Sequence, residues 1–317
     1  MATGPVSFLE TAKYGGTNLA AGVVETLIQE SPILEQLMFT SFSGNATEVE
    51  LEDTLPTPQF RSVGEGYTRS YGTDTSRFFG VAILGGEVFI DNYQLKVQAD
   101  RKNAKAKQYS KFTKAMSRQF DETFLRGDAT AKDFKGVNTL IGEGLGSTFT
   151  MSGTTDVGVI DFEKLDQAQE NMRGTSATAI LAPQIGFRRN LTTLARNTAG
   201  YFTFLDTGTD AFGRKVTTWD DIPIRVLGDD INGDPLLPYT EDPGDGGNDG
   251  ASIYFIRYGD EENVYGLLGL DGSMDVQDFG ETESLPGHLG RVEVYPGIAI
   301  KDAYSVVRIQ GVKNATS

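Results

Sequence analysis

The chain of 317 residues contains no cysteine and only one histidine, His288. Without cysteine it can form no disulfide framework, no cysteine-ligated zinc site, no iron–sulfur cluster and no thiol nucleophile. His288 lies in the turn-like segment 286–290, and we expect it in a surface loop rather than in a catalytic triad. We therefore predict that the chain is not an enzyme and that it binds no cofactor.

Long apolar runs are also missing. The longest apolar stretch, residues 78–89, is interrupted by three glycines and one glutamate. No segment approaches the ~18 apolar residues of a membrane-spanning helix, and the first thirty residues lack a secretion signal. We therefore predict a soluble protein that has no contact with a membrane.

Basic residues are scarce overall but concentrated in one region. The chain has 28 Lys and Arg against 44 Asp and Glu, a net charge of -16 that excludes a basic DNA-binding domain. Residues 96–135 nevertheless carry eleven basic and five acidic side chains, whereas residues 229–283 carry fifteen acidic side chains and one basic. Such blocks are typical of solvated faces or of complementary contacts.

The first ninety residues read as an arm followed by a long hairpin. The apolar pattern of residues 19–38 predicts a short helix, broken at Ser31-Pro32, whose single apolar stripe must pack on something else. Alternation in residues 47–52 and a returning strand over 78–90 predict a two-stranded excursion with a flexible tip. An isolated hairpin is marginal in water, so we expect this loop to lie on a partner surface.

A long amphipathic helix is predicted over residues 92–127. This segment contains no proline, its only glycine is Gly127 at the end, and Asp91 or Asn92 can cap its start. At full length the helix would measure on the order of 50 Å. One face carries an apolar stripe at spacings of three and four: Tyr109, Phe112, Met116, Phe120 and Phe124.

The remainder reads as mixed α and β structure. A β-rich region is predicted to begin at residues 134–141, and helices are predicted at 162–172, capped by Asp161, and across 187–195. Strands are predicted at residues 177–182, 215–219, 222–227, 252–258, 291–295 and 303–309, with an acidic loop at 229–250. The fold class expected from this order is α+β.

One acidic segment offers a candidate metal site. Asp230, Asn232, Asp234 and Glu241 occupy the spacing of a calcium-binding loop. Pro235, however, stands where that loop requires glycine, and no convincing helices flank the segment. We therefore predict a solvated acidic loop without metal.

In this order, the arm, the long loop, the basic amphipathic helix and the α+β remainder resemble the major capsid proteins of tailed phages, the HK97-like capsid fold family. The resemblance covers nearly the whole chain. Segments that look like the family are Ser31-Pro32-Ile33-Leu34-Glu35, residues 120–128 (FDETFLRGD), Phe134-Lys135-Gly136-Val137, Ile222-Pro223-Ile224 and the closing strands with Arg291 and Ala303.

The resemblance implies a division of the chain and a function. The implied regions are an N-terminal arm at 1–43, an extended loop at 44–90, a peripheral domain at 91–159 and 281–317 with a spine helix at about 92–127, and an axial domain at 160–280. Copies of the chain would form hexamers and pentamers of an icosahedral shell around double-stranded DNA, held without sequence specificity. The expected location is the virion capsid, assembled in the host bacterial cytoplasm, with a portal protein and a possible decoration protein as further partners.

The chain departs from parts of that family in two ways. Some members cross-link a loop lysine to a neighbour's asparagine, but here no lysine lies between Lys13 and Lys96. We therefore expect no such cross-link from the loop. No long charged helical segment precedes the arm, so we expect any scaffolding to be a separate protein.

Without cross-links, we expect polar contacts to set the register between subunits and apolar contacts from the loop, at Leu51, Phe60, Phe78 and Phe79, to supply most of the stabilisation. Exposed ion pairs contribute only about 0.2–1 kcal/mol each. The hypothesis places the loop acids Glu48, Glu50, Glu52 and Asp53 against a neighbour's spine bases Lys105, Lys107, Lys111 and Lys114, with Arg61, Arg69 and Arg77 as further loop contacts. The acidic 229–283 block is expected in the axial domain.

Two alternatives stay open from the sequence. An encapsulin-like compartment has the same fold and encloses enzyme cargo instead of a genome. An acidic, β-rich hydrolase would be a monomer or small oligomer with a pocket. The first differs from the capsid prediction in its contents, and the second in its assembly.

Overall fold

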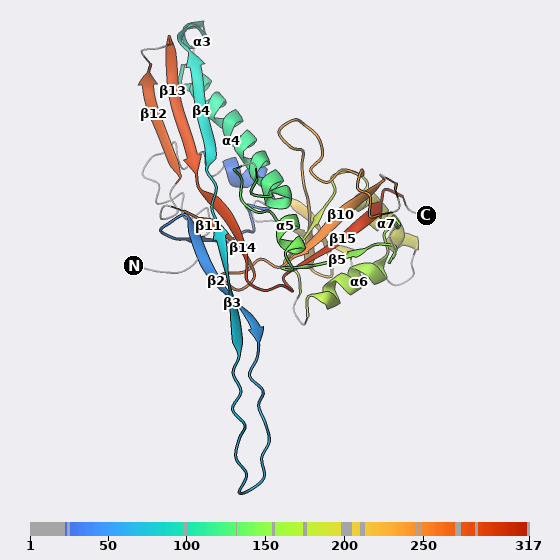
Figure 1. Ribbon diagram of the computed structural model, residues 1–317. Helices are drawn as coiled ribbons and strands as arrows, with labels where there is room; N and C mark the ends of the chain where they lie inside the picture. The colour runs from blue at the N-terminus through green and yellow to red at the C-terminus, as the bar shows by residue number, and fades with distance from the viewer. Residues whose placement is uncertain are drawn as a thin grey trace.

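The computed structural model of the chain, shown in Figure 1, consists of a body built on one seven-stranded and two three-stranded sheets, and a long projecting hairpin. It describes residues 23, 26–97, 101–130, 132–153, 156–173, 176–197, 205–209, 213–244, 246–247, 249–269, 274–282 and 285–315. The residues predicted as the beginning of the arm, 1–22, lie outside this range. The chain is α+β, as the sequence predicts.

A seven-stranded sheet forms the larger half of the body, in the order β5-β15-β10-β6-β9-β8-β7. Its third strand in this order, β10 (Gly250–Ile256), is buried along its whole length, as expected of an apolar run covered on both faces. Side chains alternate between faces. Ile253 and Phe255 join a core with helices α6 and α7, whereas Tyr254 and Ile256 join a core with helix α4. The remaining elements of this half are β5 (Ser147–Thr150), α6 (Phe162–Asn171), β6 (Ala179–Ala182), α7 (Phe187–Asn197), β7 (Leu205–Thr209), β8 (Lys215–Trp219), β9 (Ile222–Val226) and β15 (Val306–Lys313).

The range 92–127, predicted as one helix, contains two described helices, the short α3 (Asn92–Val97) and the long α4 (Arg101–Arg126). Four members of its apolar stripe are buried and Phe112 is half-buried. The helix ends at Gly127, whose N–H donates to the Thr123 carbonyl at 2.8 Å. A Cβ at Gly127 would lie 2.1 Å from the Phe134 carbonyl oxygen, so only glycine permits this close passage of the chain.

Two smaller sheets flank α4 and continue the body. β4 (Leu84–Asp91), β12 (Asp275–Glu281) and β13 (Gly287–Val294) pair in the order β12-β13-β4, and α4 packs on this sheet. Close packing needs Gly290, where a Cβ would collide with the Tyr109 hydroxyl. The second sheet joins β1 (Phe39–Ser41), β11 (Val264–Leu268) and β14 (Pro296–Ile300).

The predicted two-stranded excursion is the hairpin of β2 (Ala46–Thr54) and β3 (Thr73–Gly80), which Figure 1 shows projecting from the body. The strands pair antiparallel from Ala46↔Gly80 to Thr54↔Thr73. Residues 55–72 continue beyond them without regular structure. We call residues 46–80 the extended loop from here on.

Three predictions about local structure are wrong. Residues 134–141 do not begin a β-rich region, because Val137–Gly142 forms helix α5, whose Val137 and Leu140 are buried three positions apart beside α4. Burial of that face outweighs the β-propensity of valine and isoleucine. His288 lies in strand β13, opposite Ile90 and Glu281, rather than in a surface loop. The predicted strand over 78–90 is two strands, β3 and β4, that belong to different sheets.

The predicted domain division stays a prediction, although the sheets cross its boundaries. β15, which lies in the predicted peripheral segment 281–317, pairs with β10 of the predicted axial segment. β12 of that axial segment pairs with β13 instead. The acidic block 229–283 contributes β10, β11 and β12 to three different sheets and lies outside the extended loop.

Candidate functional site

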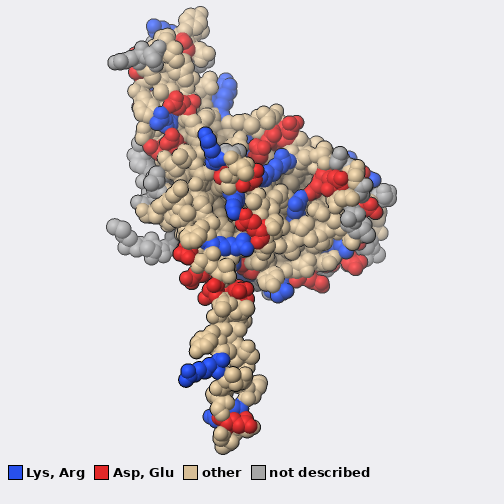
Figure 2. All heavy atoms as spheres, in the orientation of Figure 1, with Lys and Arg blue, Asp and Glu red and all other residues tan. Residues whose placement is uncertain are grey.

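The extended loop presents four carboxylates on one face. Antiparallel pairing sets Glu48 opposite Phe78, Glu50 opposite Ser76 and Glu52 opposite Asp74, and opposite residues share a face of the ribbon. We call Glu48, Glu50, Glu52 and Asp74 the acidic face; all four are exposed. Within the described part of the chain none of them forms an ion pair. Figure 2 shows acidic side chains gathered where the loop leaves the body.

The opposite face of the same ribbon anchors it to the body. Val49 and Phe79 are buried and join the core around α4, and Leu51 packs against that core. Arg77 donates to the Glu143 carbonyl at 3.0 Å and pairs with its carboxylate at 3.6 Å. The base of the loop is therefore fixed by its own chain, while the acidic face points away.

The distal part of the loop is apolar and exposed. Phe60 and Val63 are fully exposed, and Leu55, Tyr67 and Tyr71 are largely so. Exposed apolar patches of this kind mark sites of association. Of the two predicted loop arginines in this part, Arg61 lies over the Tyr67 ring at 5.2 Å and bonds to the Glu65 carbonyl, whereas Arg69 is exposed. Asp53 is exposed and accepts only a long bond, 3.4 Å, from Thr73.

The four spine lysines have different surroundings. Lys114 pairs with Glu30 of the arm at 2.8 Å, and Lys105 pairs with Asp278 at 3.5 Å and contacts His288 Nδ1 at 3.3 Å. Lys107 and Lys111 are exposed one turn apart and pair with no described residue. Within one chain, no described ion pair joins any of these lysines to the acidic face.

The arm is tied to the spine by buried polar groups that the sequence analysis does not predict. The Ser31 hydroxyl donates to Asp121 of α4, and the Ser117 hydroxyl donates to the Leu27 carbonyl at 3.2 Å. Asp121 is 3% exposed. Burial raises the pKa of Asp121 to about 8, while the bond from Ser31 opposes the rise. The carboxyl is therefore largely protonated at neutral pH.

A second tie joins the arm to the seven-stranded sheet. Glu35 and Arg225 form an ion pair at 3.1 Å with side chains 8% and 10% exposed. Buried pairs of this kind fix geometry, because either partner alone would leave an uncompensated charge. Only the contact between the arm and α4 has a pattern in the sequence that could have indicated it. Thr113, Ser117 and Asp121 follow each other at spacings of four beside the apolar stripe of α4.

The candidate calcium loop is not assembled as one. Asp230 accepts the N–H groups of Asn232 and Asp234, each at 2.8 Å, and these bonds, led by that from Asp234, lower its pKa. Glu241 instead forms an ion pair with Arg308 and accepts from Ser252 at 2.6 Å. Among the described residues no group of three acidic or histidine side chains could hold a metal ion, and no described helix could span a membrane.

Comparison with known proteins identifies the fold. No curated protein matches the sequence. The chain is similar to the holo-SrpI encapsulin complex of Synechococcus elongatus (16% identity, TM-score 0.62, 90% of this chain and 89% of that one). It is also similar to Microbacterium phage Oxtober96 (14%, 0.58, 88% and 90%) and to the satellite phage P4 procapsid with its size determination protein (13%, 0.53, 94% and 92%).

A family model matches the region that carries the loop and the spine. Residues 15–142 match the model of the major capsid protein GP7. This segment contains the extended loop, α3, α4 and α5, and the fold shared with shell proteins extends over 88 to 94% of the chain. The chain therefore has the fold of phage and encapsulin shell proteins, and residues 15–142 match a major capsid protein family.

Proposed function

We propose that the chain is the major capsid protein of a tailed phage and assembles as hexamers and pentamers into an icosahedral shell around double-stranded DNA. The observation that carries this proposal is the extended loop, whose distal side chains Phe60 and Val63 have no contact that removes them from water. A neighbouring subunit that covered them would gain roughly 25 cal/mol per Å² of apolar surface buried. The match to a phage capsid family supports the phage assignment.

In this shell the acidic face of one subunit lies against the spine helix of its neighbour. Lys107 and Lys111 are the principal cationic partners, because Lys105 and Lys114 are already paired within their own chain. Asp53, Arg61 and Arg69 extend the same contact toward the tip. Each exposed pair contributes only about 0.2–1 kcal/mol, so the pairs set register and the apolar side chains supply most of the stabilisation.

The ion pairs can be tested by charge reversal with rescue. The double substitution Glu48→Lys and Glu50→Lys should abolish particle formation, because both lysines would face Lys107 and Lys111. Lys107→Glu and Lys111→Glu in the same chain should restore particles, as judged by negative-stain imaging. Equal loss in the double and quadruple variants, with the subunit still folded, would contradict the proposed pairing.

We further propose that the shell carries no loop-lysine cross-link, since the loop contains no lysine. Residues 160–280 would form its axial domain, and residues 91–159 and 281–317 its peripheral domain. A portal protein, a separate scaffolding protein and a decoration protein are the proposed partners, and the host cytoplasm is the proposed place of assembly. The procapsid of satellite phage P4, which includes a size determination protein, supports an external assembly partner.

An encapsulin-like compartment is the second candidate, favoured by the similarity to the Synechococcus elongatus encapsulin complex. Particles purified from the native source should be treated with nuclease and their contents extracted. Protected double-stranded DNA supports the phage capsid, whereas enzyme cargo without DNA supports the compartment. The match of residues 15–142 to a capsid protein family argues against the hydrolase alternative.

A further inference from the structure

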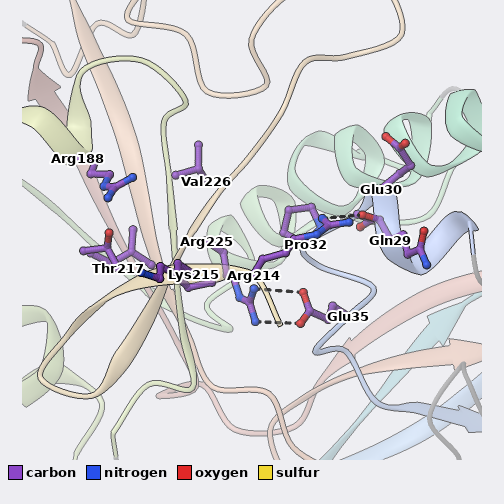
Figure 3. Close-up of a pocket in the computed structure, with 13 residues that line it drawn as sticks. Gln29, Glu30, Pro32, Glu35, Arg188, Arg214, Lys215, Thr217, Arg225 and Val226 are labelled. Atoms are coloured by element: carbon purple, nitrogen blue, oxygen red, sulfur yellow. Dashed lines mark hydrogen bonds and ion pairs between the residues drawn. The ribbon is translucent and has the colours of Figure 1, made fainter. Parts of the chain in front are cut away.

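A pocket of about 240 Å³ lies between the arm and the seven-stranded sheet. Figure 3 shows Gln29, Glu30 and Pro32 of the arm on one side, and Arg188 and Lys215 on the other. Arg188 belongs to the first turn of α7, and Lys215 begins β8. Three segments that are distant in sequence therefore converge on one cavity.

The lining is basic in a chain that is acidic overall. Four cationic side chains line the pocket, against two carboxylates: Arg188, Arg214, Lys215 and Arg225 against Glu30 and Glu35. Both carboxylates already have partners, since Glu35 pairs with Arg225 at 3.1 Å and Glu30 pairs with Lys114 at 2.8 Å. The charge left over in the pocket is positive.

The walls of the pocket are fixed by contacts between its own residues. The Arg225–Glu35 pair ties β9 to the arm, and the Arg214 guanidinium donates to the Gln29 carbonyl at 3.2 Å. Arg188 and Lys215 are exposed, and the described part of the chain offers neither of them an ionic partner. The side chains of Arg188 and Lys215 therefore lie beside a wall that is already held in place. This reduces the conformational entropy lost when a ligand binds.

We propose that this pocket binds a phosphate group, held between the Arg188 guanidinium and the Lys215 ammonium. A guanidinium offers a planar fork of N–H donors that matches two phosphate oxygens, and an ammonium adds a compact point charge. The phosphate belongs to a nucleic-acid backbone or to a free phosphate compound.

The test uses the purified full-length protein and two probes. The first probe is a fluorescein-labelled single-stranded oligonucleotide, followed by anisotropy across a salt series; the second is inorganic pyrophosphate, followed by the thermal midpoint of unfolding. The test variant is Arg188→Gln with Lys215→Gln, and Arg188→Lys with Lys215→Arg is the charge-conserving check. Lys96→Gln with Arg196→Gln is the matched control, since both residues are exposed and the charge change is identical.

We expect the test variant to bind the oligonucleotide at least tenfold more weakly, with a salt slope smaller by about 1.4 for two lost cations. The control and the charge-conserving variants should stay within twofold of wild type. Pyrophosphate stabilisation that is lost in the test variant, without oligonucleotide binding, supports the site and assigns it to free phosphate compounds. A circular dichroism melt of each variant checks that it is folded.

Three results would overturn the proposal: no response to either probe, equal weakening in the test and control variants, or preferential binding of a polyglutamate peptide over both probes. The nucleic-acid source rests on the proposed phage function, but the phosphate site does not. Imaging of particles formed by the test variant distinguishes failure of the phosphate site from failure of the proposed capsid function. Normal particles with lost phosphate binding leave the capsid proposal intact.

Discussion

The extended loop and the seven-stranded sheet are both made of paired strands, yet they are stabilised in different ways. Every residue of β10 is buried between two layers of side chains. In the loop, Phe78 is 69% exposed and the acidic face has like charges, Glu52 and Asp74, directly opposite each other. The side chains of β10 are covered by their own chain, whereas the loop exposes apolar and like-charged side chains, as expected of a surface that contacts another subunit.

The largest difference should appear when phenylalanine is replaced by alanine in the core of the body and in the extended loop. Phe124, on α4, is fully buried beside Phe120. We expect Phe124→Ala to lower the free energy of unfolding of the unassembled subunit by about 4 kcal/mol, because it leaves a cavity. Urea denaturation measures the loss. A loss comparable to that of an exposed residue would show that this core does not carry the stability of the body.

The tie between arm and sheet should have the next largest effect. Glu35→Gln leaves the Arg225 guanidinium buried without its carboxylate. We expect a loss of about 3 kcal/mol in the free energy of unfolding, measured by urea denaturation. The exposed pair Arg291–Glu87 provides the control, since Glu87→Gln should cost no more than about 1 kcal/mol.

The tie between arm and spine should make stability depend on pH. The pKa of Asp121 is about 8 in the folded chain, against 3.8 without burial, so the native state holds a proton that the unfolded state releases between these values. Stability from this group is greatest below pH 4 and falls as pH rises to about 8. Asp121→Asn should flatten the profile over that window, measured as the difference from wild type in thermal unfolding. Parallel profiles would contradict a protonated Asp121.

The smallest effect on folding is expected in the loop. Phe78→Ala should change the free energy of unfolding of the subunit by less than about 0.5 kcal/mol, because the ring is already in water. Assembly should nevertheless fail or weaken, as measured by light scattering and size-exclusion chromatography. Normal assembly by this variant would show that Phe78 is not part of the interface.

The features that the sequence predicts correctly arise from residue patterns within a single segment. The spine helix follows from a local apolar stripe, and the acidic face follows from alternation within β2. Strands β11 and β14 are missed, because each is a short apolar run containing glycine. Their partners, β1 and one another, are set by the packing of distant segments.

The contacts of the candidate functional site also depend on residues that are distant in sequence. An aspartate on a helix is expected to face solvent, and the burial of Asp121 is decided by Ser31, ninety residues earlier. Glu241 fits the spacing of a calcium-binding loop, yet its carboxylate forms an ion pair with Arg308. Sequence spacing predicts which residues can share a face of a helix or strand. It does not predict which side chains distant in sequence form hydrogen bonds or ion pairs with them.

The central claim is that the extended loop is half of an interface between copies of this chain. The most direct test is a cryo-electron microscopy map of the assembled particle that resolves side chains. We predict that the loop of one subunit lies across its neighbour's spine, with the carboxylates of the acidic face within about 4 Å of Lys107 and Lys111. A shell in which the loop projects into solvent, or in which the acidic face meets no cation of a neighbour, would contradict the account.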